Sequence, residues 1–371
     1  MDLFSYYRQF DDVDEEELNL ERRKRRHEER RQALERVPDL DLSGTEWPDM
    51  PDSEIVNAAI YRARGRVNGY PDRHASGIRR LLAERHDVEP EQVVLGNGAA
   101  DLLQAAALTL LGEGDELITP WPSYPLYPLM AARAGARPVS VAYEDGPRGS
   151  TLAAAVTDRT RAIVICNPND PTGHYLPANE LGPLLAVLPE RVHVLLDEAL
   201  VHFQEAEEED ACLRLVDAFP RLLVVRTFSK AYGLSGLRAG YAVGTDAGLL
   251  GTIAPVHGVN ALTQAAVEHA LRTGDAEIER RRETVLSERA RLLRGLLDLT
   301  VEVGASHGNF LWLRAREMDG RELAERLRKQ GSIVAPGGPL GADEHIRATV
   351  RDSAASDRML RALENILVGG Q

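Results

Sequence analysis

Short apolar runs, rich in Val, Ile and Leu, recur along the chain from about residue 90, and helical segments separate them. The runs are QVVLG (92–96), DELITP (115–120), RPVSVAY (137–143), RAIVIC (161–166), RVHVLLD (191–197) and RLLVVRTF (221–228). Continuous apolar strands that alternate with amphipathic helices are typical of βαβ units, in which helices cover both faces of a mostly parallel sheet. The pattern therefore predicts an α/β domain.

The pattern changes after about residue 270. A long amphipathic helix is predicted for DAEIERRRETVLSERARLLRGLLDL (275–299). It is followed by TVEVGASHGNFLWLRA, the helix GRELAERLRKQ, the runs SIVAP and HIRATVR, and a last helix. This order predicts a smaller α+β unit at the C-terminus.

The first 40 residues are highly charged and predict a helical arm that ends at Pro38, because a proline disfavours helix at the residue before it. We accordingly divide the chain into an N-terminal helical arm (1–45), a large domain (46–270) and a small C-terminal domain (271–371).

The composition limits the cellular compartment and the kinds of partner that we expect. The chain has 371 residues, of which 43% are hydrophobic, and it has no apolar run of about 18 residues that would span a membrane. Its acidic start, MDLFSYYRQFDDVDEEE, is unlike a signal peptide. The two cysteines, Cys166 and Cys212, are too few and too far apart for a disulfide framework or a C-x-x-C metal site. We expect a cytoplasmic protein without a membrane partner or a metal.

The net charge of -14 argues against a nucleic-acid partner, since phosphate backbones are bound by basic surfaces. The one basic run, ERRKRRHEERR (21–31), follows DDVDEEE and contains glutamates of its own. A solvated helix with i,i+4 charge pairs is favoured there over a patch for RNA or a partner.

Polar segments follow four of the predicted strands: VVLGNGAADLL, VICNPNDPTG, VLLDEAL and VVRTFSK. Each alone has an ordinary explanation, either a glycine turn or a helix N-cap. Ligands of parallel sheets collect where the C-terminal ends of the strands meet, however, and all four segments belong to that rim. Together they predict one binding site.

The turn at residues 96–100 opens a helix whose free N–H groups favour an anion, most simply a phosphate. Ser229 and Arg238 are candidates to complete this pocket, the arginine through bidentate contacts. Neither a P-loop motif nor a dinucleotide-binding glycine pattern is present, so the phosphate belongs to another cofactor.

A carboxylate and a lysine complete the candidate chemistry. Asp197 ends the apolar run VHVLL, where its charge is costly unless it meets a cation such as a pyridinium nitrogen. Lysine occurs only at Lys24, Lys230 and Lys329, and a chain that otherwise uses arginine needs a primary amine only where arginine cannot serve. Lys230 can form a Schiff base and then act as a base. Phosphate, pyridinium and lysine together indicate pyridoxal 5′-phosphate.

The motif S-K-x-x-G-L-x-G-x-R-x-G is complete from Ser229 to Gly240, and NPNDPTG and DEA precede it. From about residue 40 to its end, the chain resembles the fold-type I pyridoxal-phosphate enzymes. Within them it is similar to the class I/II aminotransferases, nearest the histidinol-phosphate aminotransferase and threonine-phosphate decarboxylase branch. The resemblance implies a large domain with a mostly parallel seven-stranded sheet and a smaller α+β C-terminal domain.

The same resemblance implies roles for single residues. Lys230 would hold the internal aldimine and move the proton, Asp197 would pair with the pyridine nitrogen, and Tyr124 would stack on the ring, which makes these three the catalytic set. Asn167 would hydrogen-bond the ring hydroxyl, and Tyr70 would reach the phosphate of a neighbouring subunit in a homodimer with shared active sites. The phosphate would be held by Gly98, Ala99, Ala100, Ser229 and Arg238, with Thr227 as an addition.

On the substrate side, Arg347 matches the family arginine that clamps a carboxylate, and Asn309 follows an S-x-x-N-F pattern. The segment SGTEWPDMP (43–51) replaces the family's N-terminal pattern, so Gly44, Glu46 and Trp47 are candidates to shape the substrate pocket, with a capped turn and a core tryptophan as the alternative.

Two further departures are informative. Leu200 stands where the family commonly has a tyrosine that donates to the ring hydroxyl oxygen, so we expect a raised aldimine pKa. Ala335 stands where the branch often has an arginine, which disfavours a doubly anionic substrate such as histidinol phosphate.

These residues predict an aminotransferase that takes an amino acid, or an amine derived from one, and a keto acid in ping-pong half-reactions. The alternative is a decarboxylase, lyase, cyclase or oxidase of an amino-acid substrate in specialised metabolism, because the pocket decides which bond to Cα breaks. A non-catalytic protein of the same fold is disfavoured by the retention of Lys230, Asp197, Asn167 and Arg238.

Overall fold

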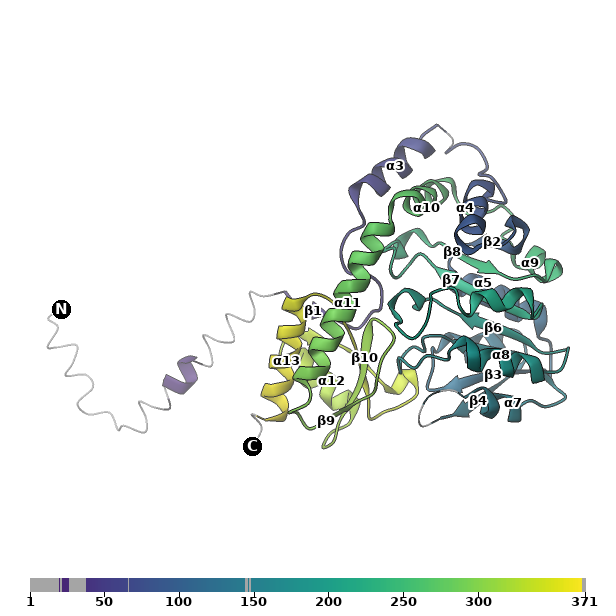
Figure 1. Cartoon of the computed structure of the whole chain (residues 1–371). Coiled ribbons are helices and arrows are strands. Elements are labelled where there is room, and N and C mark those ends of the chain that lie inside the picture. The colour runs from purple at the N-terminus through teal and green to yellow at the C-terminus, as the bar shows by residue number, and fades with distance from the viewer. Residues whose placement is uncertain are drawn as a thin grey trace, which may run out of the picture.

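The computed structural model describes residues 20, 22–26, 38–65, 67–143, 146 and 148–368. Residues 20 and 22–26 are helical, as predicted for the arm, and the remainder of the arm up to residue 37 lies outside the described residues. The described residues from 38 onward form a large sheet with its helices and a smaller C-terminal domain beside it (Figure 1).

A seven-stranded sheet in the order β2-β8-β7-β6-β5-β3-β4 forms the centre of the large domain. Only β8 runs antiparallel to its neighbours, so the predicted mostly parallel seven-stranded sheet is confirmed. Six strands fall on the six apolar runs, and β8 was not predicted. The strands are β2 (Val93–Gly96), β3 (Glu116–Trp121), β4 (Arg137–Ala142), β5 (Thr160–Cys166), β6 (His193–Asp197), β7 (Leu222–Thr227) and β8 (Gly240–Val243).

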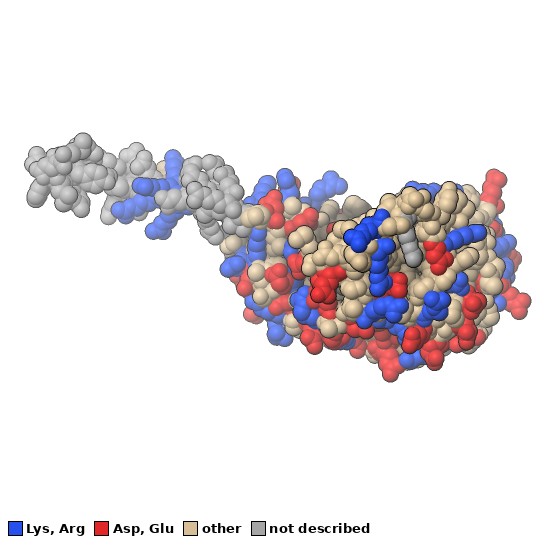
Figure 2. All heavy atoms as spheres, turned by 90° about the horizontal axis from the view of Figure 1, so that it is seen from above, with Lys and Arg blue, Asp and Glu red and all other residues tan. Residues whose placement is uncertain are grey.

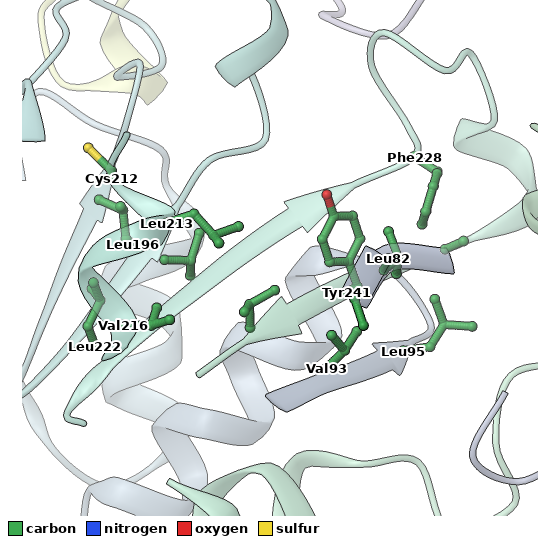
Figure 3. Close-up of a cluster of buried hydrophobic side chains, with 14 of the residues drawn as sticks. Leu82, Val93, Leu95, Leu196, Cys212, Leu213, Val216, Leu222, Phe228 and Tyr241 are labelled. Atoms are coloured by element: carbon green, nitrogen blue, oxygen red, sulfur yellow. The ribbon is translucent and has the colours of Figure 1, made fainter. Parts of the chain in front are cut away.

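Both faces of this sheet are buried, which explains why its strands are continuously apolar. Successive residues of β7 point to opposite sides, since Leu222 and Val224 belong to one hydrophobic cluster while Leu223 and Val225 belong to the other. Figure 3 shows part of the first cluster, in which Tyr241 of β8 lies among apolar side chains from several elements.

Helices supply the opposing surfaces. On one face lie α4, α8 and α10, and on the other lie α5, α6 and α9, each contributing buried apolar residues to the cluster it covers. Helix α3 packs against α10. The helices are α3 (Ser53–Ala63), α4 (Ser76–His86), α5 (Ala99–Leu110), α6 (Leu126–Arg133), α7 (Gly149–Ala154), α8 (Ala178–Val187), α9 (Ala247–Ile253) and α10 (Ala261–Thr273).

The small C-terminal domain is built on an antiparallel sheet in the order β12-β13-β10-β9. The three predicted helices pack on it, and the longest, α11, also runs alongside the large domain (Figure 1). The elements are α11 (Asp275–Gly295), β9 (Val301–Val303), β10 (Phe310–Ala315), α12 (Gly320–Lys329), β11 (Ser332–Ile333), β12 (Ala335–Pro336), β13 (Ile346–Thr349) and α13 (Ser353–Leu367).

The chain enters this small domain before it enters the large one. Strand β1 (Leu40–Asp41) pairs in parallel with β11, and Leu42 lies in the hydrophobic core of the small domain. Residues 38–45, which were assigned to the arm, therefore pack with the C-terminal part of the chain. The division at residues 45 and 270 stays a proposal.

The described surface carries charges of both signs. Figure 2 shows basic and acidic side chains interspersed over the described part of one face, without a continuous basic area there. Among the described helices, none combines the length and the apolar character that crossing a membrane requires.

Candidate active site

A cavity of about 220 Å³ lies at the C-terminal ends of the parallel strands, where the four polar segments were expected to meet. It is lined by Glu46, Ala99, Ala100, Tyr124, Leu126, Cys166, Asp170, Asp197, Ala199, Leu200, Thr227, Ser229, Lys230, Ser235 and Arg238. Strands β6 and β7, the loop after β7 and the first turn of α5 thus deliver predicted residues to one place.

The phosphate-binding candidates form one wall. Helix α5 begins after Gly98 without a side-chain cap, so its first N–H groups are free to meet an anion. Arg238 donates to the Oγ of Ser229 at 3.3 Å and lies over Gly98. A Cβ atom at residue 98, where φ is +103°, would lie 2.5 Å from Nη2 of Arg238, so only glycine leaves room for this arrangement.

Asp197 forms the base of the cavity and is only 5% exposed. Its Oδ2 accepts a hydrogen bond of 2.9 Å from the hydroxyl of Tyr127, and its Oδ1 accepts one of 3.1 Å from the N–H of Ala199. Burial raises the pKa of the Asp197 carboxyl to about 6, although both hydrogen bonds and the charge of Lys230 oppose the rise. The fully buried Tyr127 was not predicted, since a tyrosine inside a helix gives no sign of its partner.

Lys230 extends from the loop after β7 into the same cavity. Its Nζ donates to Oγ1 of Thr45, another contact that the sequence did not predict. Burial lowers the pKa of the Lys230 ammonium group, and the carboxylates of Asp170 and Glu46 partly oppose this. A lysine with a lowered pKa is suited to bond to a carbonyl carbon and to carry protons.

Tyr124 lines the cavity and is 39% exposed, so its ring is accessible from the cavity side. It makes an edge contact with Tyr127 at a ring-centroid distance of 5.8 Å. An exposed aromatic ring in the same cavity lining as Lys230 and Asp197 suits stacking on a flat ring.

The residues in this cavity fit pyridoxal phosphate. The uncapped start of α5, Ser229 and Arg238 offer donors to a phosphate, and Asp197 offers a buried carboxylate to a protonated ring nitrogen. Lys230 lines the same cavity and would supply the amine that bonds to the cofactor's aldehyde.

Comparison with known proteins agrees with this fit. The family model for Aminotransferase class I and II matches residues 38–363. The chain belongs to this family. It is a pyridoxal-phosphate-dependent transferase, and the cofactor predicted from the sequence is confirmed.

Relatives of this class I and II aminotransferase include an aromatic amino acid aminotransferase of Corynebacterium efficiens, which is 36% identical over 88% of this chain and 93% of its own. Histidinol-phosphate aminotransferase 1 of Nitrosococcus oceani is 33% identical over 88% of both chains. The histidinol-phosphate aminotransferase of Sinorhizobium meliloti, solved in complex with pyridoxal-5′-phosphate, has a TM-score of 0.80 and 27% identity, over 91% of this chain and 94% of that one.

One predicted cofactor ligand does not reach the cavity of this aminotransferase. Both amide atoms of Asn167 are engaged by the backbone of Leu176, the Nδ2 donating to its carbonyl at 2.9 Å and the Oδ1 accepting from its N–H at 2.7 Å. The side chain is 1% exposed and points into the protein. Asp170, three residues further along NPNDPTG, lines the cavity instead. The sequence analysis did not single it out, although an acidic residue within this motif is a signal that could have done so.

The predicted substrate residues gather around the segment 43–47. Arg347 donates to the carbonyl of Ser43 at 2.6 Å, and Asn309 donates to the carbonyl of Thr45 at 3.0 Å. The carbonyl of Gly44 accepts from Thr349 rather than facing the cavity, which makes its role one of backbone structure.

The other two candidates from this segment, Glu46 and Trp47, have different surroundings. Glu46 lines the cavity. Trp47 lies in a hydrophobic cluster, with the guanidinium of Arg281 over its ring at 5.0 Å, as in the alternative of a core tryptophan.

Tyr70 is not among the residues that line the cavity of its own chain. It is 86% exposed and stacks on His257 at a centroid distance of 5.4 Å. Its predicted reach to a second subunit stays a prediction.

The structure also shows the surroundings of Leu200 and Ala335, the two residues that depart from the family pattern. Leu200 lines the cavity and packs in the cluster that contains Trp47 and Phe310. Ala335 on β12 lies opposite Arg347 on β13. No second arginine is therefore present at this position of the small sheet.

Proposed function

We propose that this aminotransferase moves the amino group of an amino acid, or of an amine derived from one, to a keto acid in two half-reactions at a single site. The observation that carries the proposal is the meeting of Lys230, Asp197 and the uncapped start of α5 in one cavity. These are the amine, the buried carboxylate and the anion site that the chemistry needs.

When bound, pyridoxal phosphate supplies an aldehyde joined to a ring that accepts electrons from the substrate's Cα. Lys230 would hold the cofactor and, once released by the substrate amine, would serve as the base that accepts the proton from Cα. Its lowered pKa favours the neutral amine that can accept this proton. The hydroxyl of Thr45 holds Nζ on the side of the cavity that faces the small domain.

Asp197 keeps the ring nitrogen protonated, and two hydrogen bonds fix the direction in which its carboxylate points. Tyr124 positions the ring by stacking, and Arg238 with Ser229 anchors the phosphate at the start of α5. The segment 43–47 covers the cavity from the small-domain side and limits the access of water to Lys230.

We further propose a cytoplasmic homodimer in which Tyr70 reaches the phosphate of the second subunit. A tyrosine that is 86% exposed in the single chain supports this, because large aromatic side chains are enriched at interfaces. Measurement of mass in solution tests the dimer. Tyr70→Phe tests the contact, with weaker cofactor binding as the expected result.

The function is tested by an anaerobic absorbance titration of the cofactor-loaded protein with single amino acids and amines, with Lys230→Ala as the control. Conversion of the bound cofactor to its amine form, reversed by a keto acid, is the expected result. Release of carbon dioxide or ammonia, with the original absorbance regained, would instead assign decarboxylation or elimination to the pocket.

A further inference from the structure

Thr45 contacts Lys230, although the two residues belong to different parts of the fold. The Nζ of Lys230 donates to Oγ1 of Thr45. Lys230 lies in the loop after β7 of the large sheet, whereas Thr45 belongs to the segment 43–47 beside the small domain. Thr45 is 5% exposed, so its side chain is largely shielded from water. The contact therefore joins the amine of the candidate site to a buried hydroxyl.

The backbone at Thr45 is held by side chains of the small domain. Its carbonyl accepts a hydrogen bond of 3.0 Å from Nδ2 of Asn309, and the carbonyl of Gly44 accepts one from the hydroxyl of Thr349. The N–H of Thr349 donates to the carbonyl of Leu42 at 3.0 Å. Asn309 and Thr349 are both buried. Because a threonine side chain is also stiff at χ1, these contacts fix the place of the Thr45 hydroxyl.

This hydrogen bond belongs to the free amine of Lys230. It requires an N–H group on Nζ that can point to Thr45, and the amine offers one while it is not bonded to the cofactor. Under the proposed function, Lys230 is free once the substrate amine has replaced it, and it then accepts the proton from Cα. The structure therefore shows Lys230 in the chemical state in which it acts as a base.

The other polar influences on Lys230 are charges. Burial lowers the pKa of its ammonium group, and the guanidinium of Arg347 also lowers this pKa. The carboxylates of Asp170, Glu46 and Asp197 raise it. Attraction between charges changes little when the amine rotates, whereas a hydrogen bond requires an N–H group to point at its acceptor. The hydroxyl is therefore suited to set the direction of the amine.

A neutral amine has two N–H groups and one lone pair, and an N–H held by Thr45 leaves the lone pair for the proton of the substrate. In this step the Cα–H bond breaks and the proton forms a third N–H bond on Lys230. The electron pair stays with Cα and passes into the cofactor ring. The resulting ammonium group keeps its hydrogen bond to Thr45, which is stronger once the donor is charged.

We infer, building on the proposed function, that Thr45 is a positioning residue for proton transfer, whose hydroxyl orients the amine of Lys230 and stabilises the ammonium group that forms. The small domain takes part through Asn309 and Thr349, because they hold the backbone around Thr45. The segment 43–47 thus contributes to the chemical step in addition to covering the cavity.

The inference is tested first by kinetics of the cofactor-loaded protein, with L-phenylalanine and its Cα-deuterated form as probes. Thr45→Val keeps the shape of the side chain and removes the hydroxyl. It should lower kcat by about tenfold or more, change KM by less than about twofold, and enlarge the isotope effect on kcat, because proton transfer becomes slower. Thr45→Ser keeps the hydroxyl and should restore most of kcat.

Thr252→Val is the matched control, since Thr252 is an exposed threonine of α9 whose hydroxyl bonds only to the carbonyl of Gly248. It should leave kcat, KM and the isotope effect unchanged. An unchanged kcat and isotope effect in Thr45→Val would overturn the inference.

A second measurement needs neither substrate nor cofactor. The rate at which acetic anhydride labels Lys230 is followed against pH by mass spectrometry of the full chain. Lys329, whose side chain is 71% exposed, is the internal reference. Thr45→Val removes an acceptor of the ammonium group, so the pKa of Lys230 should fall by about one pH unit, and Thr45→Ser should bring it back. Equal pKa values in the wild type and Thr45→Val would contradict the inference.

The two measurements separate the inference from the function on which it rests. If no amino acid converts the bound cofactor, the proposed function fails, while labelling still decides whether Thr45 acts on Lys230. If the pKa shifts and kcat does not, Thr45 has no part in proton transfer. Thr45→Ala takes the place of Thr45→Val in both measurements, with the same expected results, if that variant does not fold.

Discussion

The hydroxyl of Tyr127 donates a hydrogen bond of 2.9 Å to Oδ2 of Asp197, and both residues are buried beneath the cavity. This contact favours the ionised carboxylate against the effect of burial. Under the proposed function, in which Asp197 meets the ring nitrogen, Tyr127 is a positioning residue that acts through Asp197.

Tyr127→Phe should weaken binding of pyridoxal phosphate by about tenfold, because a hydrogen bond to a charged group is lost. The pKa of Asp197 should rise further, so the acid side of the pH profile for cofactor binding should move to higher pH. Absorbance titration of the cofactor-free protein at several pH values measures both. Tyr175→Phe, which removes a hydroxyl bonded to Glu207 away from the cavity, should change neither.

The raised pKa of Asp197 also predicts how the stability of the cofactor-free protein depends on pH. Its folded pKa of about 6 exceeds the ordinary value of 3.8, so ionisation between these values favours the unfolded chain. The free energy of unfolding of the wild type should therefore fall, relative to Asp197→Asn, by about 3 kcal/mol as pH rises from about 4 to about 7. Urea unfolding of both proteins checks this, and parallel pH profiles would contradict it.

Leu200 tests the predicted effect of the missing tyrosine. Leu200→Tyr supplies a hydroxyl at the cavity wall and should lower the pKa at which the absorbance of the bound cofactor changes, since a hydroxyl that donates to the ring oxygen stabilises the deprotonated form. A visible titration against pH measures this value. Leu200 is 2% exposed, so Leu200→Phe is needed to separate the effect of bulk from that of the hydroxyl. Equal pKa values in the two variants would refute the explanation.

Gly98→Ala should disturb the predicted phosphate-binding residues, because the new Cβ would contact Nη2 of Arg238. The backbone at residue 98 is also left-handed, which favours glycine. We expect affinity for pyridoxal phosphate to fall by about tenfold or more, with little change for pyridoxal, which lacks the phosphate. Gly182→Ala in α8, where a Cβ has open space, is the matched control. A parallel loss for both ligands would point to general damage instead.

The apolar runs predicted six of the seven strands in the large sheet, because a strand covered on both faces is apolar throughout. Strand β8, with the sequence GYAV, was missed because it is short and begins at the last glycine of the motif. Strand β1 was missed because its two residues pair with β11, nearly 300 positions away in the sequence. The hydrophobic pattern of a short segment does not show such a distant partner.

The candidate site shows the same limit at the level of side chains. Motifs located Lys230, Asp197, Ser229 and Arg238, whose positions at strand ends bring them to one rim. The motifs did not show which residue of NPNDPTG lines the cavity. That depends on the hydrogen bonds between Asn167 and Leu176, which hold the Asn167 side chain away from the cavity. Thr45 was not predicted either, because only the fold brings it to Lys230.

The ion pair between Asp170 and Arg347 joins the loop after β5 of the large sheet to β13 of the small one. The two sheets are therefore held together by a charged contact at the edge of the cavity. Any change that removes either charge acts on the packing of the two domains as well as on the cavity.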